Sequence, residues 1–164
     1  WLYEGRTPDQ CEQELARYVE KLERWVHEAS SYSDKRPRTR FEIDYRGKHV
    51  GSCASYLIDA DCDITCSGDA KPLGRAIGVC IFDPEDRRHG IAAKALTVFI
   101  GYLKSRGSQR IFTQTWSGNE RMIGLARKLG FVEYRRKVGI RSVRGGSYDG
   151  LTFELILQDA HKQR

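Results

Sequence analysis

The sequence contains no apolar run of membrane-spanning length, no internal repeat and no linker that would separate two domains. A membrane-spanning helix needs about 20 consecutive apolar residues. The 164 residues are 40% hydrophobic and 30% charged, which is typical of a soluble globular protein. We therefore expect one domain over residues 1–164, with its own core and no membrane partner. An initiator methionine is also absent, because the chain begins at Trp1, so the lack of a signal peptide excludes nothing.

The sequence also lacks the even, regularly spaced set of cysteines that is typical of a disulfide-bonded protein. The five cysteines are odd in number and scattered, at Cys11, Cys53, Cys62, Cys66 and Cys80. Cys53 and Cys80 fall in strand-like runs, so buried free thiols in a reducing compartment explain the set best, and we expect a cytoplasmic protein. Cys62 and Cys66 are the single close pair. No further Cys or His lies near them to complete four zinc ligands, so we expect no metal site.

Positive charge is in excess, with a net charge of +6. A polyanionic partner, such as a nucleotide cofactor, a nucleic acid or an acidic surface, is one interpretation, and solubility alone is the other. A basic nucleic-acid-binding domain has this charge. The sequence lacks a basic helix face with interleaved aromatic residues, however, and this argues against nucleic acid as the partner.

The order of predicted elements indicates the fold. Thr7 and Gln10 form a capping box around Pro8, and an apolar stripe then predicts a long helix to Ala29 with its apolar face in the core. The stripe comprises Cys11, Leu15, Tyr18, Val19, Leu22, Trp25, Val26 and Ala29. The later segments, in order, are strands at Thr39–Tyr45 and His49–Ile58 with a possible bulge at Gly51, an unassigned stretch at Asp59–Gly74, a strand at Ala76–Phe82, a helix ending near Arg106–Gly107, a strand at Gln109–Thr115, a short helix after Asn119, and strands at Phe131–Val138 and Tyr148–Leu157 around a hairpin tip at Arg141–Gly146. This order predicts an α+β fold with one or two parallel crossovers.

The segment after the central strand predicts an anion site. Ala76–Phe82 is an apolar run that Asp83–Asp86 ends, and Arg87, Arg88 and Gly90 then lead into a helix. A helix start offers backbone N–H groups and a positive dipole end, while glycine admits a close ligand and arginine can fork onto phosphate. The alternative is an ordinary helix start with solvated arginines.

Two motifs together resemble the GNAT superfamily of N-acetyltransferases. Arg87–Ala92, R-R-H-G-I-A, is similar to the superfamily's acetyl-CoA pyrophosphate loop. Asn119–Phe131, N-E-R-M-I-G-L-A-R-K-L-G-F, is similar to its second signature. The order and spacing of the two motifs, each preceded by a strand, make the resemblance specific over Arg75–Leu157. The ending S-Y-D-G-L-T-F-E-L-I resembles the branch that acetylates the N-terminal alanine or serine of ribosomal proteins.

The resemblance implies a mixed, mostly antiparallel twisted sheet, flanked by helices and split by a V-shaped opening that holds acetyl-CoA. Pantetheine would pair with the strand end, and the pyrophosphate would lie on the loop that follows. The cofactor-binding residues implied in this way are Cys80, Ile81, Phe82, Arg87, Arg88, His89, Gly90, Ile91, Ala92 and Asn119. Family members also carry a first strand and short helix before the long helix. No such segment precedes Pro8, so we expect the sequence to lack them.

The resemblance leaves the catalytic groups open. Many relatives carry a tyrosine directly after the leucine of the second motif, where it can protonate the leaving thiolate, and here Ala126 stands at that position. No carboxylate matches a family base. Ser117 and Tyr134 are the available hydroxyls and the predicted catalytic residues, with Tyr134 alternatively an ordinary strand residue.

The expected function is acetyl transfer from acetyl-CoA to a primary amine, with a protein N-terminal α-amine as the first choice. A polyamine or antibiotic amine, or a catalytically silent domain that binds acyl-CoA, are the alternatives within the fold. We expect a monomer or homodimer.

Overall fold

The computed structural model of the chain describes residues 7–10, 12–13, 16–17, 19–20, 37–65 and 71–155. The chain divides into two compact units, Trp1–Pro37 and Arg38–Arg164. In the part that is described, no helix is long and apolar enough to cross a membrane.

The first unit contains the predicted N-terminal helix. Its described residues from Pro8 to Glu20 are helical. The Thr7 N–H donates to Gln10 Oε1 (3.0 Å) and the Gln10 N–H donates to Thr7 Oγ1 (3.3 Å), so the predicted capping box is confirmed. Val19 is the described member of the apolar stripe and is exposed. The other stripe residues and the predicted helix end at Ala29 lie outside the described residues.

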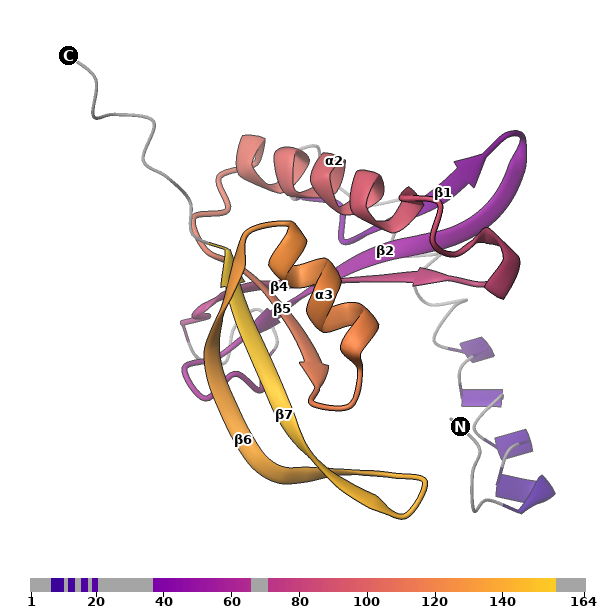
Figure 1. Cartoon of the computed structure of the whole chain (residues 1–164), viewed down its shortest axis with the longest axis vertical. Coiled ribbons are helices and arrows are strands. Elements are labelled where there is room, and N and C mark those ends of the chain that lie inside the picture. Colours follow the sequence, from indigo (N-terminus) through magenta and orange to yellow (C-terminus); the bar gives the residue numbers. More distant parts are fainter. Residues whose placement is uncertain are drawn as a thin grey trace. The chain divides into compact units, whose positions relative to one another are not determined.

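The second unit is built on a seven-stranded sheet with the strand order β1-β2-β4-β5-β7-β6, and β3 pairs with the outer part of β2 (Figure 1). Its strands are β1 (Arg40–Tyr45), β2 (Lys48–Ile58), β3 (Ile64–Thr65), β4 (Gly74–Ile81), β5 (Ile111–Trp116), β6 (Phe131–Val143) and β7 (Gly146–Leu155). Only β4 and β5 are parallel among these described pairs. The mixed, mostly antiparallel fold with one parallel crossover is therefore confirmed.

Two helices cover one face of this sheet. Helix α2 (Ile91–Ser105) makes the crossover between β4 and β5, and α3 (Glu120–Lys128) follows β5. Leu96, Phe99 and Leu103 of α2 and Ala126 of α3 share one buried cluster with Phe153 of β7. Burial of apolar surface stabilises a fold by about 25 cal/mol for each Å². Packing in this cluster therefore holds both helices against the sheet. Ala126 is 1% exposed, so this position is filled by a small core residue.

A bulge bends β2 beside its close approach to β4. Ile43 pairs with Gly51 and Asp44 with His49, which leaves Val50 as the extra residue. A Cβ on Gly51 would meet the Cys80 carbonyl oxygen, so only glycine fits there. The predicted bulge is thus present one residue before Gly51, and Gly51 itself lets the two strands touch.

The sequence-based boundaries were wrong at the C-terminal hairpin. β6 ends at Val143 and β7 begins at Gly146. The hairpin tip is therefore the two residues Arg144 and Gly145, and not the whole of Arg141–Gly146. Cross-strand pairing extends the strands through a polar, glycine-rich segment that local composition assigned to a loop. The unassigned stretch contains β3. Cys53 and Cys62 are buried and free as expected, but Cys80 is exposed.

Candidate active site

The central feature of the site is a fork between β4 and β5. The two strands pair over three positions, Arg75 with Ile111, Ala76 with Phe112 and Ile77 with Thr113. Beyond these positions Gly78–Ile81 stays paired with β2 and Gln114–Trp116 with β7. The strands therefore separate toward their carboxyl ends, as Figure 1 shows. We name Gly78–Ile81 and Gln114–Trp116 the fork, and it is the predicted V-shaped opening.

The loop after β4 is braced from both sides. Asp83 precedes a short 3₁₀ turn, Pro84–Asp86. Lys48 Nζ on the β1–β2 hairpin contacts Asp83 (2.7 Å) and Asp86 (3.0 Å). Arg87 donates from Nε to the Ile81 carbonyl (3.1 Å) and from Nη2 to the Phe82 carbonyl (2.9 Å). The Arg87 guanidinium therefore holds the loop onto the strand end, and only part of it remains to meet a phosphate.

The end of β4 itself is largely committed to the sheet. The Phe82 N–H donates to the Val50 carbonyl (3.0 Å). Ile81 packs with Ile43, Val50 and Ile91 on the side of α2. Cys80 is exposed and pairs with Ser52 across β2. Three strand-end residues were predicted to meet pantetheine. Of these, the Cys80 side chain is exposed, the Ile81 side chain faces the core, and the Phe82 N–H is already bound to the Val50 carbonyl.

The start of α2 is open to an anion, unlike the start of α3. Gly90 precedes α2 at φ +77°, where glycine is favoured, and a Cβ built on it would have no neighbour within 4 Å. The first turn of α2 has no side-chain cap and no acidic residue. Its first backbone bond runs from the Lys94 N–H to the Gly90 carbonyl (3.0 Å), which leaves earlier N–H groups for a ligand. Residues Arg88, His89 and Gly90 are exposed.

Asn119 caps α3 with its own side chain. Its Oδ1 accepts from the Met122 N–H (3.2 Å), and Glu120 lies in the first turn. The Nδ2 group is the part of Asn119 that remains for a ligand. Because the carboxyl ends of parallel neighbouring strands meet at one edge of a sheet, Asn119 after β5 and the loop after β4 lie at the same edge.

The two predicted catalytic hydroxyls lie at different ends of β5. Ser117 follows the fork, where its Oγ accepts from the Asp149 N–H (3.0 Å). Tyr134 lies against the paired end, with its ring edge-on to Phe112 (5.4 Å between centroids) and the Arg110 guanidinium 5.3 Å from its ring centre. The structure therefore brings Ser117, and not Tyr134, to the separated part of the strands.

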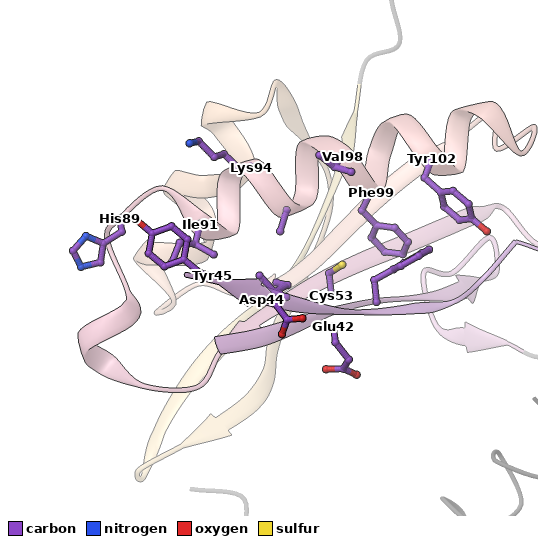
Figure 2. A pocket seen from close by; sticks show the side chains of 13 residues that line it. Glu42, Asp44, Tyr45, Cys53, His89, Ile91, Lys94, Val98, Phe99 and Tyr102 are labelled. Carbon is purple, nitrogen blue, oxygen red and sulfur yellow. The ribbon is translucent and has the colours of Figure 1, made fainter. Parts of the chain in front are cut away.

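A hollow of about 500 Å³ lies elsewhere, between β1 and α2. Figure 2 shows Phe99 and Tyr102 projecting from α2 toward β1, with His89 and Lys94 at the other end. Its lining includes no residue of β5. The hollow is thus distinct from the fork, and it meets the loop only at His89 and Ile91.

Comparison with known proteins decides the family. Residues 2–131 match the model of the Acetyltransferase (GNAT) family. The chain belongs to this family. It is accordingly an N-acetyltransferase that uses acetyl-CoA, and the interpretation as a nucleic-acid-binding domain is set aside. No curated protein matches the chain.

Solved structures of GNAT enzymes share the fold at low sequence identity. The ribosomal-protein-alanine N-acetyltransferase of Brucella melitensis has 19% identity and a TM-score of 0.65, covering 87% of this chain and 78% of that one. The ribosomal-protein-S18-alanine N-acetyltransferase of Escherichia coli has 17% identity and a TM-score of 0.57, covering 82% and 79%. A Salmonella typhimurium protein described as an acetyltransferase and solved with its cofactor acetyl-CoA has 18% identity and a TM-score of 0.59, covering 72% and 64%.

The residues of this GNAT chain fit acetyl-CoA. The free space at Gly90 and the uncapped start of α2 suit a pyrophosphate, and exposed Arg88 adds charge beside them. Acetyl-CoA supplies the activated acetyl group. Within the described residues no group of three or more His, Cys, Asp or Glu is placed to hold a metal ion.

Two carboxylates of β7 are held in ion pairs. Asp149 contacts Arg136 Nη1 (2.7 Å) and accepts from the Gly139 N–H (3.0 Å). The contact with Arg136 is the larger of the two causes, with the Gly139 hydrogen bond second, that hold the pKa of Asp149 below its ordinary value. Glu154 forms a two-point pair with Arg110 (2.7 and 3.0 Å). A general base works best with a pKa near the operating pH, so Asp149, whose pKa is lowered, is a poor base.

Sequence reasoning missed one tyrosine beside the fork. Tyr56 of β2 reaches across β4, and its hydroxyl donates to Gln114 Oε1 (3.0 Å) at the first fork position of β5. Nothing in the sequence around Tyr56 marks it, because it is one residue of an ordinary strand. The contact depends on the strand order β2-β4-β5, which only the folded sheet supplies.

Proposed function

We propose that this enzyme acetylates the α-amine at a protein N-terminus, with acetyl-CoA held in the fork. The proposed cofactor contacts are the strand end at Cys80, Ile81 and Phe82, the loop residues Arg87–Ala92 and the Asn119 amide. Ser117 and Tyr134 remain predictions for catalytic roles. A cytoplasmic location and a monomeric or homodimeric state also remain predictions.

The observation that carries the proposal is that Asp149 and Glu154 of β7 are each held by an arginine. An amine must lose its proton before it attacks. At pH 7.4 a lysine side chain with a pKa of about 10.4 carries a penalty of about 4 kcal/mol, whereas an α-amine with a pKa of about 7.7–8.0 carries well under 1 kcal/mol. Because Asp149 and Glu154 are each bound to an arginine, neither is free to offset the lysine penalty by acting as a base. The names of two structurally similar enzymes, both ribosomal-protein-alanine N-acetyltransferases, agree with this choice of acceptor.

The test uses three acceptors under one set of conditions. The first is a peptide with a free N-terminal alanine and one internal lysine, the second is the same peptide with a blocked N-terminus, and the third is spermidine. We expect kcat/KM to be highest for the free peptide, with a pH profile that levels near the α-amine pKa of about 8. Faster turnover of the blocked peptide would contradict the proposal, and faster turnover of spermidine would establish the small-amine alternative.

A further inference from the structure

The side chain of Tyr56 spans the narrow end of the fork. Tyr56 pairs with Ala76 on β4, and Ala76 in turn pairs with Phe112 on β5. The Tyr56 hydroxyl then meets Gln114, one residue beyond the last β4–β5 pair at Thr113. The Tyr56 ring packs against the buried cluster of Ile58, Cys62, Ala76 and Phe112, which fixes its direction.

The hydrogen bonds around Gln114 determine which way the Tyr56 hydroxyl points. The nitrogen of the Gln114 amide lies 2.7 Å from the Cys62 carbonyl oxygen and 3.0 Å from Thr152 Oγ1. A backbone carbonyl can only accept, so this side of the amide must be Nε2 and the side facing Tyr56 must be Oε1. An amide oxygen can only accept as well. The Tyr56 hydroxyl must therefore donate its hydrogen to Gln114, and its oxygen lone pairs are left to accept from another donor.

A free space lies at the start of the β4 arm of the fork. Gly78 is the first fork residue of β4, and a Cβ built on it would have no neighbour within 4 Å. Gly78 lies opposite Ala54 on β2, two residues from Tyr56, so the three positions share the sheet face that α2 and α3 leave uncovered. We take this face as the side on which the acceptor approaches the fork.

The Tyr56 hydroxyl stays protonated at neutral pH. Burial raises the pKa of Tyr56 above its ordinary value, and the positive charge of Arg141 on β6 acts in the opposite direction. Arg141 is the charged group that acts on the pKa of Tyr56. The groups hydrogen-bonded around Gln114, which are the Cys62 carbonyl and the Thr152 hydroxyl, are neutral. A protonated phenol cannot remove a proton from the amine, but its oxygen can accept a hydrogen bond from it.

We propose that Tyr56 is the residue that orients the acceptor amine, with its oxygen accepting a hydrogen bond from the amine N–H and Gln114 acting as the positioning residue behind it. The inference rests on the proposed placement of acetyl-CoA in the fork. In the reaction the amine nitrogen forms the new C–N bond, and the C–S bond breaks with its electron pair on sulfur. The nitrogen loses one proton, the sulfur gains one, and Tyr56 keeps its own. The hydrogen bond strengthens as the nitrogen becomes positive during attack, which is when it accelerates the reaction.

The test begins with Tyr56→Phe, which removes only the oxygen. We expect kcat/KM for the amine to fall about tenfold to a hundredfold, with an unchanged pH profile because no base is lost. The acetyl-CoA-induced rise in melting temperature should stay as in the wild type. Tyr102→Phe is the matched control. Its hydroxyl also makes one hydrogen bond, from the Arg38 N–H (2.7 Å), but it lies on α2, and this variant should match the wild type.

A double-mutant cycle tests the role of Gln114. As a single variant, Gln114→Met should lower kcat/KM. In the Tyr56→Phe background it should lower kcat/KM little further, because Gln114 acts through the Tyr56 hydroxyl oxygen. Independent, additive effects would overturn the positioning role, and wild-type kcat/KM in a folded Tyr56→Phe enzyme that still binds acetyl-CoA would overturn the whole inference. If the wild type shows no acetyl-CoA-induced rise in melting temperature, the failure belongs to the proposed cofactor site. Should Tyr56→Phe not fold, loss of amine turnover with retained acetyl-CoA binding in Gln114→Met supports the inference, and unchanged turnover overturns it.

Discussion

Gly90 and Gly107 stand at the two ends of α2 in nearly the same backbone conformation. Their φ values are +77° and +85°, and a Cβ on either would have no neighbour within 4 Å. Alanine at either position therefore costs a similar amount, about 1–2 kcal/mol, through backbone strain alone. The two glycines differ in one respect, which is that only Gly90 borders the proposed phosphate site.

We predict that Gly90→Ala weakens acetyl-CoA binding at least about tenfold, since the added methyl group occupies space needed for close approach to the helix start. Gly107→Ala should lose comparable stability, a few degrees in melting temperature, and keep wild-type affinity. Calorimetric titration of both variants checks this. Equal affinities for the two would show that the space at Gly90 is not used by the phosphates.

At this scale the sequence was informative where a residue acts through its own motif. Gly90 and Asn119 lie in local patterns whose geometry is fixed by neighbours in the chain, and both occupy the expected helix-start positions. Arg87 remains a predicted phosphate contact, but the sequence did not show that its guanidinium also binds the Ile81 and Phe82 carbonyls. Tyr56 was missed altogether. Side-chain partners across strands depend on register, and register is not written in the local sequence.

Helix α3 provides a prediction at the scale of an element. Asn119 has two separable functions, the Oδ1 cap on the Met122 N–H and the proposed contact of Nδ2 with acetyl-CoA. Asn119→Ala removes both, and we expect a loss of about 1 kcal/mol in the free energy of unfolding together with weaker acetyl-CoA binding. Asn119→Ser keeps a capping oxygen but has no amide group, so it should retain near-wild-type stability with reduced affinity. Denaturant titration and calorimetry give the two readouts. If Asn119→Ser binds acetyl-CoA as the wild type does, Asn119 is a cap and nothing more.

The elements themselves were best predicted where a cap or a period is strong. α2 and α3 begin and end close to the predicted residues because Gly90, Asn119 and the apolar spacing are local signals. The C-terminal hairpin was less well predicted. Its outer half is exposed, Val138 and Ile140 included, so burial in the core does not define it, and pairing with the partner strand extends it.

At the scale of the molecule, the order of elements predicted the α+β sheet with a parallel crossover, and the family resemblance predicted its opening. Neither could give the length of the fork, because it depends on where β4 and β5 stop pairing after Thr113. The carboxylate pair of Asp149 with Arg136 forms across the β6–β7 hairpin, and that of Glu154 with Arg110 joins segments 44 residues apart. Such long-range contacts decide whether a charged group is a base or a structural partner.

The positive charge of the whole molecule leads to a prediction about salt. The net charge is +6, and the proposed phosphate site combines a helix start with exposed Arg88. Screening shortens from about 10 Å at 0.1 M salt to 3 Å at 1 M, so acetyl-CoA affinity should fall as salt rises. Arg88→Met should lower the affinity and flatten this dependence more than Arg87→Met does, because the Arg87 guanidinium is bound to two carbonyls of its own strand.

Arg144 is the matched control for Arg88, since both are exposed arginines at positive φ, +50° and +68°. Arg144 lies at the tip of the β6–β7 hairpin, where replacement by methionine changes the net charge equally. If the salt dependence came from the net charge of the molecule, Arg144→Met and Arg88→Met would flatten it to the same extent. We expect Arg88→Met to flatten the salt dependence and Arg144→Met to leave it unchanged, because the charge nearest the phosphates contributes most to the part of the affinity that salt screens. Titrations of acetyl-CoA at three salt concentrations distinguish the two outcomes, and parallel curves for the wild type and Arg88→Met would remove Arg88 from the site.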